Sequence, residues 1–283
     1  MIGSEAELPA ATRVGRVALR VNDLDRMVEF YRDVIGLVVR RHEDGRASLG
    51  TDDEPLLELY AAPDAPKRGR EETGLFHTAF RVPSRTALGD ALGRVRERWR
   101  LDGASDHLVS EALYLTDPED NGVEVYRDRP RGEWPLAADG TVRMATLPLD
   151  TDEIVDRRRG ETTVRPRTTV GHVHLEVSSL SAARAFYVDA LGFRVRQRYG
   201  PSALFVAAGD YHHHVGLNTW NGRTAPPAGR GLDWFELLVP RRDDLDAVRE
   251  RCADGAGRVS DEGGRTVFDP DGIELRLRVA AGS

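Results

Sequence analysis

Alternating apolar and polar residues recur along the chain and predict short strands. The segments "RVALRV" from Arg16 and "HVHLEV" from His172 both alternate with a period of two, as strands with one buried face do. The first is followed by apolar residues at helical spacing, Met27, Phe30 and Ile35, which predicts a helix. Both places are therefore predicted to hold a strand, a turn, a helix and a further strand.

Residues that start and stop helices stand at matching places in both segments. Asp23 and Ser179 precede the two predicted helices and are expected to act as N-caps. Gly36 and Gly192 follow them and are expected to end the helices. The boundaries of both helices are therefore predicted from residue types alone.

The two segments are copies of one another. "VGRVALRVNDLDRMVEFYRDVIGL" begins at Val14 and "VGHVHLEVSSLSAARAFYVDALGF" begins at Val170, 156 residues later, and the two align without a gap. A weaker repeat relates the segment from Leu75 to the segment from Leu232. The sequence therefore predicts a chain built from internal repeats.

Taken together, the repeats predict four βαβββ modules, which begin near Val14, Gly74, Val170 and Gly231. The fold class expected is α+β, with an N-terminal domain over residues 12–130 and a C-terminal domain over residues 168–283, each made of two modules. A linker over residues 131–167 is expected to hold a short helix around Asp152–Arg157.

Composition narrows the classes of partner. The formal net charge is −7, which gives no electrostatic support for a nucleic-acid partner. No stretch approaches 18 consecutive apolar residues and the first residues are polar, so we expect a cytoplasmic protein without a membrane partner. A disulfide scaffold is excluded because Cys252 is the one cysteine. Homo-oligomers are common among βαβββ proteins, and the oligomeric state is left open.

Four longer motifs carry a resemblance to a known family. They are "GLFHTAFRVPSR" from Gly74, "DHLVSEALYLTDPEDNGVEVYRDRPRGEW" from Asp106, "GHVHLEV" from Gly171 and "YHHHVGLNTWNGRTAPP" from Tyr211. With the tandem modules, they resemble the vicinal oxygen chelate superfamily of glyoxalases, bleomycin resistance proteins and extradiol dioxygenases, and most closely its catechol 2,3-dioxygenases. The resemblance runs from about Val14 to the C-terminus and implies two tandem vicinal-oxygen-chelate domains.

In that superfamily, metal ligands come from the first and the last strand of a module. The corresponding positions here are, for the first strands, Arg16, His77, His172 and Trp234 and, for the last strands, about Glu58, Glu124, His214 and Glu274. The resemblance therefore implies that His77, Glu124 and His172 are the metal ligands, contributed by modules two and three. Arg16 and Trp234 cannot ligate a metal.

Two neutral imidazoles and one carboxylate suit a non-haem Fe(II) that must also bind substrate and dioxygen. Mn(II) is an alternative because the same ligands serve both ions. The expected partners are a small aromatic diol and O2. The expected reaction opens the ring of catechol or a substituted catechol next to the diol, giving a muconic semialdehyde, in the degradation of aromatic compounds.

The reaction also needs groups that take up and return protons. By resemblance, an acid–base histidine follows the first-strand ligand by about 40 residues, where His212 and His214 stand. The run is predicted to lie on the last strand of module three, where these two share a face and His213 points away; His214 is preferred. His107 and Tyr114, which precede Glu124 by 17 and 10 residues, are the further catalytic residues that the resemblance implies.

Several of these residues have an ordinary structural interpretation. His174 competes with His172 as a ligand because both lie on one strand face, and the alignment with His77 decides for His172. Glu274 is expected to be structural or a remnant of a lost site. A lone strand histidine such as His77 is more often a core residue than a ligand, so the assignment depends on the three ligand positions occurring together.

Two other functions fit the same modules. A glyoxalase-type isomerase or lyase would use Ni(II) or Zn(II) and usually a second glutamate, at a position where His214 stands here. A binding protein of the bleomycin-resistance kind would need an aromatic cleft and no metal. The predicted histidines and Glu124 favour the dioxygenase, and a hydroquinone dioxygenase is its close variant.

Overall fold

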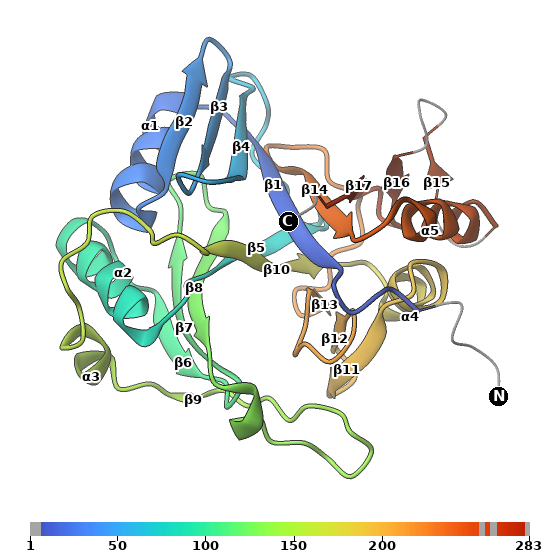
Figure 1. Cartoon of the computed structure of the whole chain (residues 1–283). Helices are drawn as coiled ribbons and strands as arrows, with labels where there is room; N and C mark the ends of the chain where they lie inside the picture. Colours follow the sequence, from blue (N-terminus) through green and yellow to red (C-terminus); the bar gives the residue numbers. More distant parts are fainter. Residues whose placement is uncertain (1–6, 255–257, 261–264, 281–283) are drawn as a thin grey trace. The chain divides into compact units, whose positions relative to one another are not determined.

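The computed structural model describes residues 7–254, 258–260 and 265–280 (Figure 1). Strands and a smaller number of helices alternate along this part of the chain, which confirms the predicted α+β class. The C-terminal end of the predicted second domain, residues 281–283, lies outside the described residues.

The first two modules follow the predicted element order. Module one comprises β1 (Arg13–Val21), α1 (Leu24–Phe30), the π-helix η1 (Tyr31–Ile35), β2 (Val38–Glu43), β3 (Arg46–Gly50) and β4 (Pro55–Ala61). Module two comprises β5 (Gly74–Arg81), α2 (Arg85–Arg98), β6 (Gly103–Asp106), β7 (Ser110–Thr116) and β8 (Gly122–Asp128). The linker that follows holds η2 (Arg131–Glu133), β9 (Leu147–Pro148) and α3 (Thr151–Val155), the last close to the predicted short helix.

The last two modules repeat this order. Module three comprises β10 (Thr169–Glu176), α4 (Leu180–Arg184), the π-helix η3 (Ala185–Ala190), β11 (Arg194–Tyr199), β12 (Ala203–Ala207) and β13 (Val215–Asn218). Module four comprises β14 (Gly231–Val239), α5 (Arg242–Asp254), β15 (Arg258–Val259), β16 (Thr266–Phe268) and β17 (Glu274–Val279).

All four modules share one strand pairing. The first strand of each module pairs in parallel with its last strand: β1 with β4, β5 with β8, β10 with β13 and β14 with β17. The remaining pairs within a module are antiparallel. The parallel pair lies at one edge of each module's four strands and brings the first and last strands side by side, where the ligand positions expected from the sequence lie.

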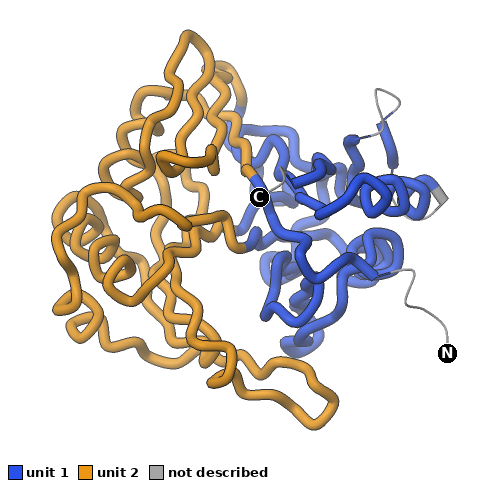
Figure 2. The backbone as a smooth tube through the Cα atoms, viewed as in Figure 1, with its two compact units in different colours: residues 1–15, 66–76, 172–283 blue, residues 16–65, 77–171 orange. Residues whose placement is uncertain are grey.

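The chain divides into two compact units (Figure 2). Unit 1 comprises residues 1–15, 66–76 and 172–283, and unit 2 comprises residues 16–65 and 77–171. Unit 1 thus holds most of modules three and four, and unit 2 holds most of modules one and two. The domain boundaries drawn from the sequence, at residues 130 and 168, stay a prediction.

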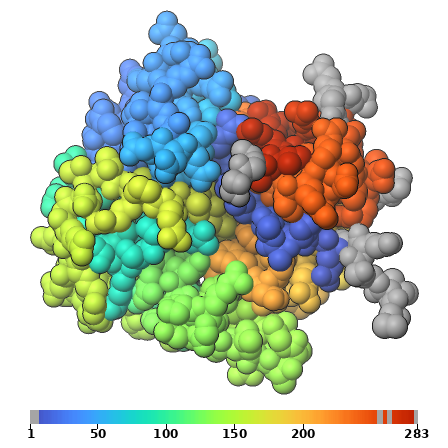
Figure 3. All heavy atoms as spheres, in the orientation of Figure 1, coloured from blue at the N-terminus to red at the C-terminus, as the bar shows by residue number. Residues whose placement is uncertain are grey.

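One part of the linker is exposed at the surface of unit 2, and another part pairs with its sheet. The segment around residues 131–145 (green) lies at the surface in Figure 3, and Leu136 in it is exposed. Further along, Leu147 and Pro148 of β9 pair antiparallel with β6. No helix among the described residues has the length and apolar character needed to cross a membrane.

The helix ends behave as the sequence predicts. The side chains of Asp23 and Ser179 accept hydrogen bonds from Arg26 N–H and Ala182 N–H and cap α1 and α4. Gly36 ends η1 with φ of 87°, a left-handed conformation that favours glycine. A Cβ there would also lie 2.7 Å from the guanidinium of Arg94, so both backbone and space require glycine.

An arginine of the next helix hydrogen-bonds to the end of the π-helix in each unit. Arg94, on α2, donates to the carbonyl oxygens of Val34 and Ile35. Arg251, on α5, donates in the same way to the carbonyl oxygens of Ala190 and Leu191. Each arginine satisfies helix-end carbonyls that would otherwise lack partners and ties the two modules of its unit together.

A buried tyrosine–aspartate hydrogen bond is also repeated in both units. Tyr31 donates to Asp117 at 2.9 Å in unit 2, and Tyr187 donates to Asp269 at 3.1 Å in unit 1. Both tyrosines are buried and belong to the core. Each bond joins the helix of one module to the turn before the last strand of the next.

The same turns hold the helix starts of the neighbouring modules. Glu119 accepts from the backbone N–H groups of Asn22 and Asp23, and Asp271 accepts from the N–H of Ser178. A carboxylate at the start of a helix offsets its orphan donors and favours its dipole. The "DPEDNG" and "DPDG" turns therefore reverse the chain and also connect neighbouring modules through hydrogen bonds to the backbone at the helix starts.

We predict that Asp269 makes stability depend on pH. Burial raises the pKa of Asp269 to about 7, above its unfolded value, so the folded state binds the proton more tightly and loses stability as pH rises from about 4 to about 7. Asp269→Asn keeps the hydrogen-bonding shape without the charge. Measured by urea unfolding, the free energy of unfolding of the wild type relative to the variant should fall by roughly 2–3 kcal/mol between pH 5 and pH 8. Equal pH dependence in the two proteins would contradict the assignment.

Candidate metal centre

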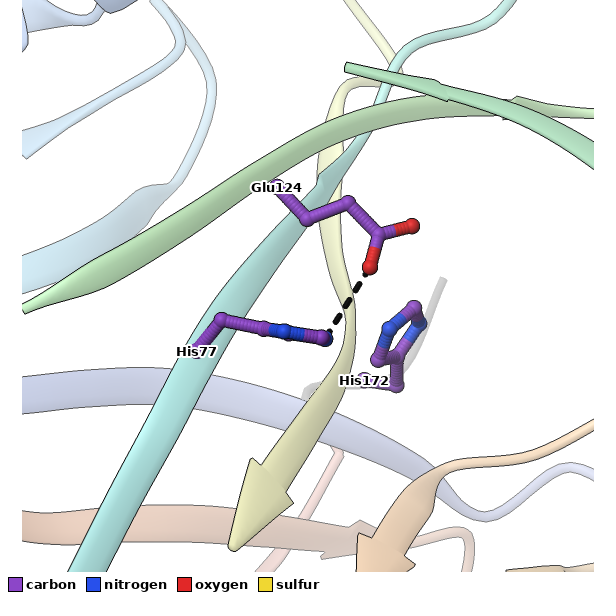
Figure 4. A group of neighbouring side chains, drawn as sticks. All are labelled: His77, Glu124 and His172. Carbon is purple, nitrogen blue, oxygen red and sulfur yellow. Dashed lines mark ion pairs between the residues drawn. The ribbon is translucent and has the colours of Figure 1, made fainter. Parts of the chain in front are cut away.

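Three buried side chains from three strands come together. His77 lies on β5, Glu124 on β8 and His172 on β10, and their ligand atoms all lie within 4.8 Å of one another (Figure 4). Their exposed fractions are 6 %, 2 % and 2 %. Figure 4 shows the two imidazole rings and the carboxylate directed toward a common point.

Strand pairing explains why His77 and Glu124 meet. β5 and β8 run in parallel, with His77 opposite Gly122 and Ala79 opposite Glu124. His77 and Ala79 are two residues apart and share one face of β5, so the side chains of His77 and Glu124 lie on the same face of the pair. The His77 Nε2 atom lies 3.0 Å from the Glu124 carboxylate.

The buried carboxylate of Glu124 needs a compensating charge or hydrogen bonds. A carboxylate taken out of water costs several kcal/mol unless a positive charge or hydrogen bonds compensate. His77 provides one compensating partner, and a divalent cation held by all three residues would provide far more. The charge balance of this buried group therefore favours a cation.

The donor set fits a first-row divalent metal. Atoms bound next to one another on such an ion lie about 3 Å apart, since the bonds are about 2.1 Å long; the His77–Glu124 distance of 3.0 Å has that value. Two imidazoles and one carboxylate are the ligand type of non-haem Fe(II) sites with open positions. These residues could hold such an ion with small side-chain rotations.

Tyr114 and His107 lie beside this group, as the resemblance implied. Tyr114 on β7 is directly opposite Glu124 on β8, and its ring centroid lies 5.8 Å from that of His77. Its hydroxyl lies 2.6 Å from Nε2 of His107. Burial, and then the nearby Glu124 carboxylate, raise the pKa of Tyr114 well above its usual 10, which keeps the phenol protonated at neutral pH.

The triple histidine does not have the conformation expected from the sequence. β13 begins at Val215, so His212, His213 and His214 precede the strand, and strand alternation cannot assign their directions. The prediction that the three histidines lie on a strand was wrong. The backbone of His214 bonds to Val173 and Val206 of the neighbouring strands, but the regular strand begins only at Val215.

The three rings point to different surroundings. The ring centroid of His213 lies 4.0 Å from that of His172, with the planes tilted by 47°, and the ring centroid of His212 lies 6.1 Å from it. The Nδ1 atoms of His212 and His213 share a hydrogen bond of 2.7 Å. His214 packs against Tyr211 at 4.9 Å, and its Nδ1 accepts from the N–H of Ala208.

His174, the rival of His172, packs in an aromatic group. Its ring lies 5.1–5.5 Å from those of Phe76, Phe205 and Trp220. The group of ligand atoms around Glu124 contains His172 and not His174. The geometry therefore agrees with the choice that the repeat alignment made.

Modules one and four replace the ligands with other interactions. Glu58, at the position that corresponds to Glu124, is buried and accepts from Arg16 at 2.8 Å and Arg46 at 3.0 Å. Glu274 pairs with Arg276, whose guanidinium lies over the ring of Trp234 at 4.1 Å. An internal cation thus balances these carboxylates, as expected for positions without histidine.

Two contacts near the site could not be predicted from the sequence. The ring contact of His213 with His172 depends on a loop conformation that residue types do not specify. The carbonyl of Ala145, 2.6 Å from Nδ1 of His107, belongs to the linker and carries no side-chain information at all.

The family comparison matches most of the chain. The model of the Glyoxalase/Bleomycin resistance protein/Dioxygenase superfamily matches residues 13–125 and 169–277. These two ranges correspond to the two pairs of modules.

Curated relatives are dioxygenases by name. The chain is 43% identical over 250 residues to the catechol-2,3-dioxygenase of Bacillus subtilis strain 168, covering 85% of this chain and 87% of the relative. It is 32% identical over 120 residues to biphenyl-2,3-diol 1,2-dioxygenase 3 of Rhodococcus globerulus, covering 41% of this chain and 63% of that protein.

Solved structures share the fold. Glyoxalase I of Zea mays aligns with a TM-score of 0.57 at 17% identity, covering 94% of this chain and 92% of that one. A structure from Bacillus subtilis strain 168 aligns with a TM-score of 0.63 at 14% identity, covering 98% and 87%. At these identities the likeness concerns the fold alone.

We predict that the full-length protein binds one divalent ion through the three residues. His77→Ala, Glu124→Ala and His172→Ala should each weaken the binding of Fe(II) or Mn(II) by on the order of 100-fold or more, measured by anaerobic titration calorimetry. His42→Ala is the matched control, because His42 lies on β2 and pairs with Asp25. Unchanged affinity in the Glu124 variant would show that the ligand assignment is wrong.

Proposed function

Because the chain belongs to the glyoxalase/bleomycin resistance protein/dioxygenase superfamily, we propose that it is an extradiol dioxygenase that uses Fe(II) to open the ring of catechol or a substituted catechol. The observation that carries the proposal is the buried His77–Glu124–His172 group. The similarity to a catechol-2,3-dioxygenase over most of both chains supports the reaction class.

The reaction consumes one diol and one O2 and needs no further reductant. Both oxygen atoms enter the product, which for catechol is a muconic semialdehyde. When bound, Fe(II) supplies adjacent open positions for the two diol oxygens and O2, and a path for electrons from the ring to O2. Mn(II) could serve with the same ligands.

His77, Glu124 and His172 have two tasks in this reaction. As neutral imidazoles and one carboxylate they leave a net positive charge on a bound divalent ion, which favours the ionised diol. Their burial excludes bulk water from the reacting atoms and strengthens these electrostatic interactions. The ligands therefore bind and orient, while proton transfer falls to neighbouring groups.

A histidine of the triple run takes the proton of a diol hydroxyl and later returns it. The ring contact with His172 favours His213, with His212 as its hydrogen-bonded partner. His214 was preferred from the sequence, and its packing against Tyr211 offers it a supporting role for the loop. We keep all three as candidates and propose His213 first.

Tyr114, the strand partner of Glu124, and His107 are the second pair of groups that we propose to handle protons. The hydroxyl of Tyr114 hydrogen-bonds with Nε2 of His107, which holds the phenol in place next to Glu124. The expected partners are accordingly an aromatic diol and O2, and the expected location is the cytoplasm.

We predict O2 uptake that depends on iron and diol together. Protein loaded anaerobically with Fe(II) and mixed with catechol should consume one O2 per diol and form the yellow ring-fission product near neutral pH, followed by an oxygen electrode and absorbance. A panel of substituted catechols and hydroquinones identifies the preferred ring. The proposal fails if none of them causes iron-dependent O2 uptake, and isomerase activity with Ni(II) or Zn(II) would then favour a glyoxalase.

We predict different effects for single changes in the proton-handling residues. His107→Ala and His213→Ala should keep the metal affinity of the wild type but lower kcat by roughly 100-fold, the usual contribution of a positioned acid or base. His214→Ala should lower kcat less. If the His214 variant loses the most activity with normal metal content, the preference based on the sequence is right and the one based on ring contacts is wrong.

A further inference from the structure

Both ring nitrogens of His107 are engaged, each by a different kind of partner. Nδ1 lies 2.6 Å from the carbonyl oxygen of Ala145, and Nε2 lies 2.6 Å from the hydroxyl of Tyr114. A carbonyl can only accept a hydrogen bond, whereas a hydroxyl can donate or accept. Nδ1 must therefore carry a hydrogen, whatever the state of Nε2.

We propose that the linker is part of the active site, because the carbonyl of Ala145 keeps a hydrogen on Nδ1 of His107. His107 can then exchange a proton only at Nε2, through the hydroxyl of Tyr114. Ala145 acts here as a positioning residue through its backbone. The proposal rests on the proposed function for its effect on turnover, but the state of the ring can be measured without any substrate.

The linker backbone is held in register beside His107. The N–H of Ala145 donates back to the carbonyl of His107 at 3.4 Å. Two residues further on, Leu147 and Pro148 pair with Asp106 and Ser105 of β6. The carbonyl of Ala145 is therefore placed by a short two-stranded pairing and not by a free loop.

The turn that carries His107 is fixed as well. Leu108 has a φ of 68°, a left-handed conformation that costs energy in a leucine. Its N–H donates to the side chain of Asp106, which also accepts from Arg129 at 2.6 Å. The half-buried Asp106–Arg129 ion pair and the Leu108 N–H bond together hold the turn next to His107 in this conformation.

The hydrogen bonds lead from the linker to the metal centre. They run from Ala145 through His107 to Tyr114, which stands opposite Glu124 in the β7–β8 pair. When Nε2 is unprotonated, Tyr114 donates to it. When Nε2 is protonated, it donates to Tyr114, whose own hydrogen then turns toward Glu124. The protonation state of Nε2 in His107 therefore sets the direction of its hydrogen bond with Tyr114, and with it whether the Tyr114 hydroxyl hydrogen points toward His107 or toward Glu124.

The ring state is tested by nitrogen-15 NMR on the full-length protein labelled in histidine, both metal-free and loaded with diamagnetic Zn(II). His107→Asn identifies the His107 signals by their loss. We expect Nδ1 to show the shift of a nitrogen that carries hydrogen at every pH from 5 to 9. A neutral ring protonated at Nε2 instead would overturn the proposal, with or without dioxygenase activity.

The role of the linker carbonyl is tested by replacing the peptide bond between Ala145 and Thr146 with an ester, through the α-hydroxy analogue of threonine. An ester carbonyl is the weaker acceptor, so we expect partial loss of the Nδ1–H state and a roughly tenfold lower kcat, with KM and metal affinity within twofold of the wild type. The same ester between Ala138 and Asp139, in the exposed part of the linker, is the matched control and should change nothing.

The two tests separate failure of this inference from failure of the proposed function. An unchanged ring state and unchanged kcat in the Ala145 ester would refute the role of the linker while leaving the dioxygenase intact. Absence of turnover in the wild type, with Nδ1 protonated as expected and sensitive to the ester, would refute the proposed function and leave the ring assignment standing.

Discussion

The structure of the site depends on the cost of burying one carboxylate. Glu124 is 2 % exposed, and its charge must be met by cations or hydrogen bonds within the protein. β8 places it beside His77 of β5 and opposite Tyr114 of β7. These neighbours offset part of the charge of Glu124, and a divalent ion held together with His77 and His172 would offset far more.

The repeated modules show that the same strand arrangement can hold a buried carboxylate either as a candidate metal ligand or in an ion pair. Both units conserve the connections that hold the modules together: Tyr31 with Asp117 in one and Tyr187 with Asp269 in the other. The ligand positions differ instead. In module one the buried Glu58 is neutralised by Arg16, a permanent cation of the chain, so the same strand geometry yields an ion pair where module two yields a candidate metal ligand.

The sequence predicted those features that depend on local patterns and on the repeat. Helix caps at Asp23 and Ser179, the stop at Gly36 and the four modules follow from residue types and spacing, and the structure has them. The choice of His77, Glu124 and His172 came from the resemblance applied to the aligned modules, and the structure groups the three residues. Their role as ligands is still a prediction.

The features that could not be predicted depend on loops and backbone atoms. The three adjacent histidines were predicted to lie on a strand, yet they precede β13, and the ring of His213 lies 4.0 Å from that of His172. The partner of His107 is a carbonyl of the linker, and every residue type offers the same carbonyl. Side-chain patterns carry no information on such contacts, since tertiary packing alone determines them.

The central claim is that His77, Glu124 and His172 bind one iron ion together. The most direct measurement is the anomalous X-ray scattering of crystals grown with Fe(II) under anaerobic conditions and recorded at the iron absorption edge. The account predicts one strong anomalous peak about 2.1 Å from an Nε2 or Nδ1 atom of each histidine and from a carboxylate oxygen of Glu124. A peak at the triple histidine or on the surface, with none among these three residues, would contradict it.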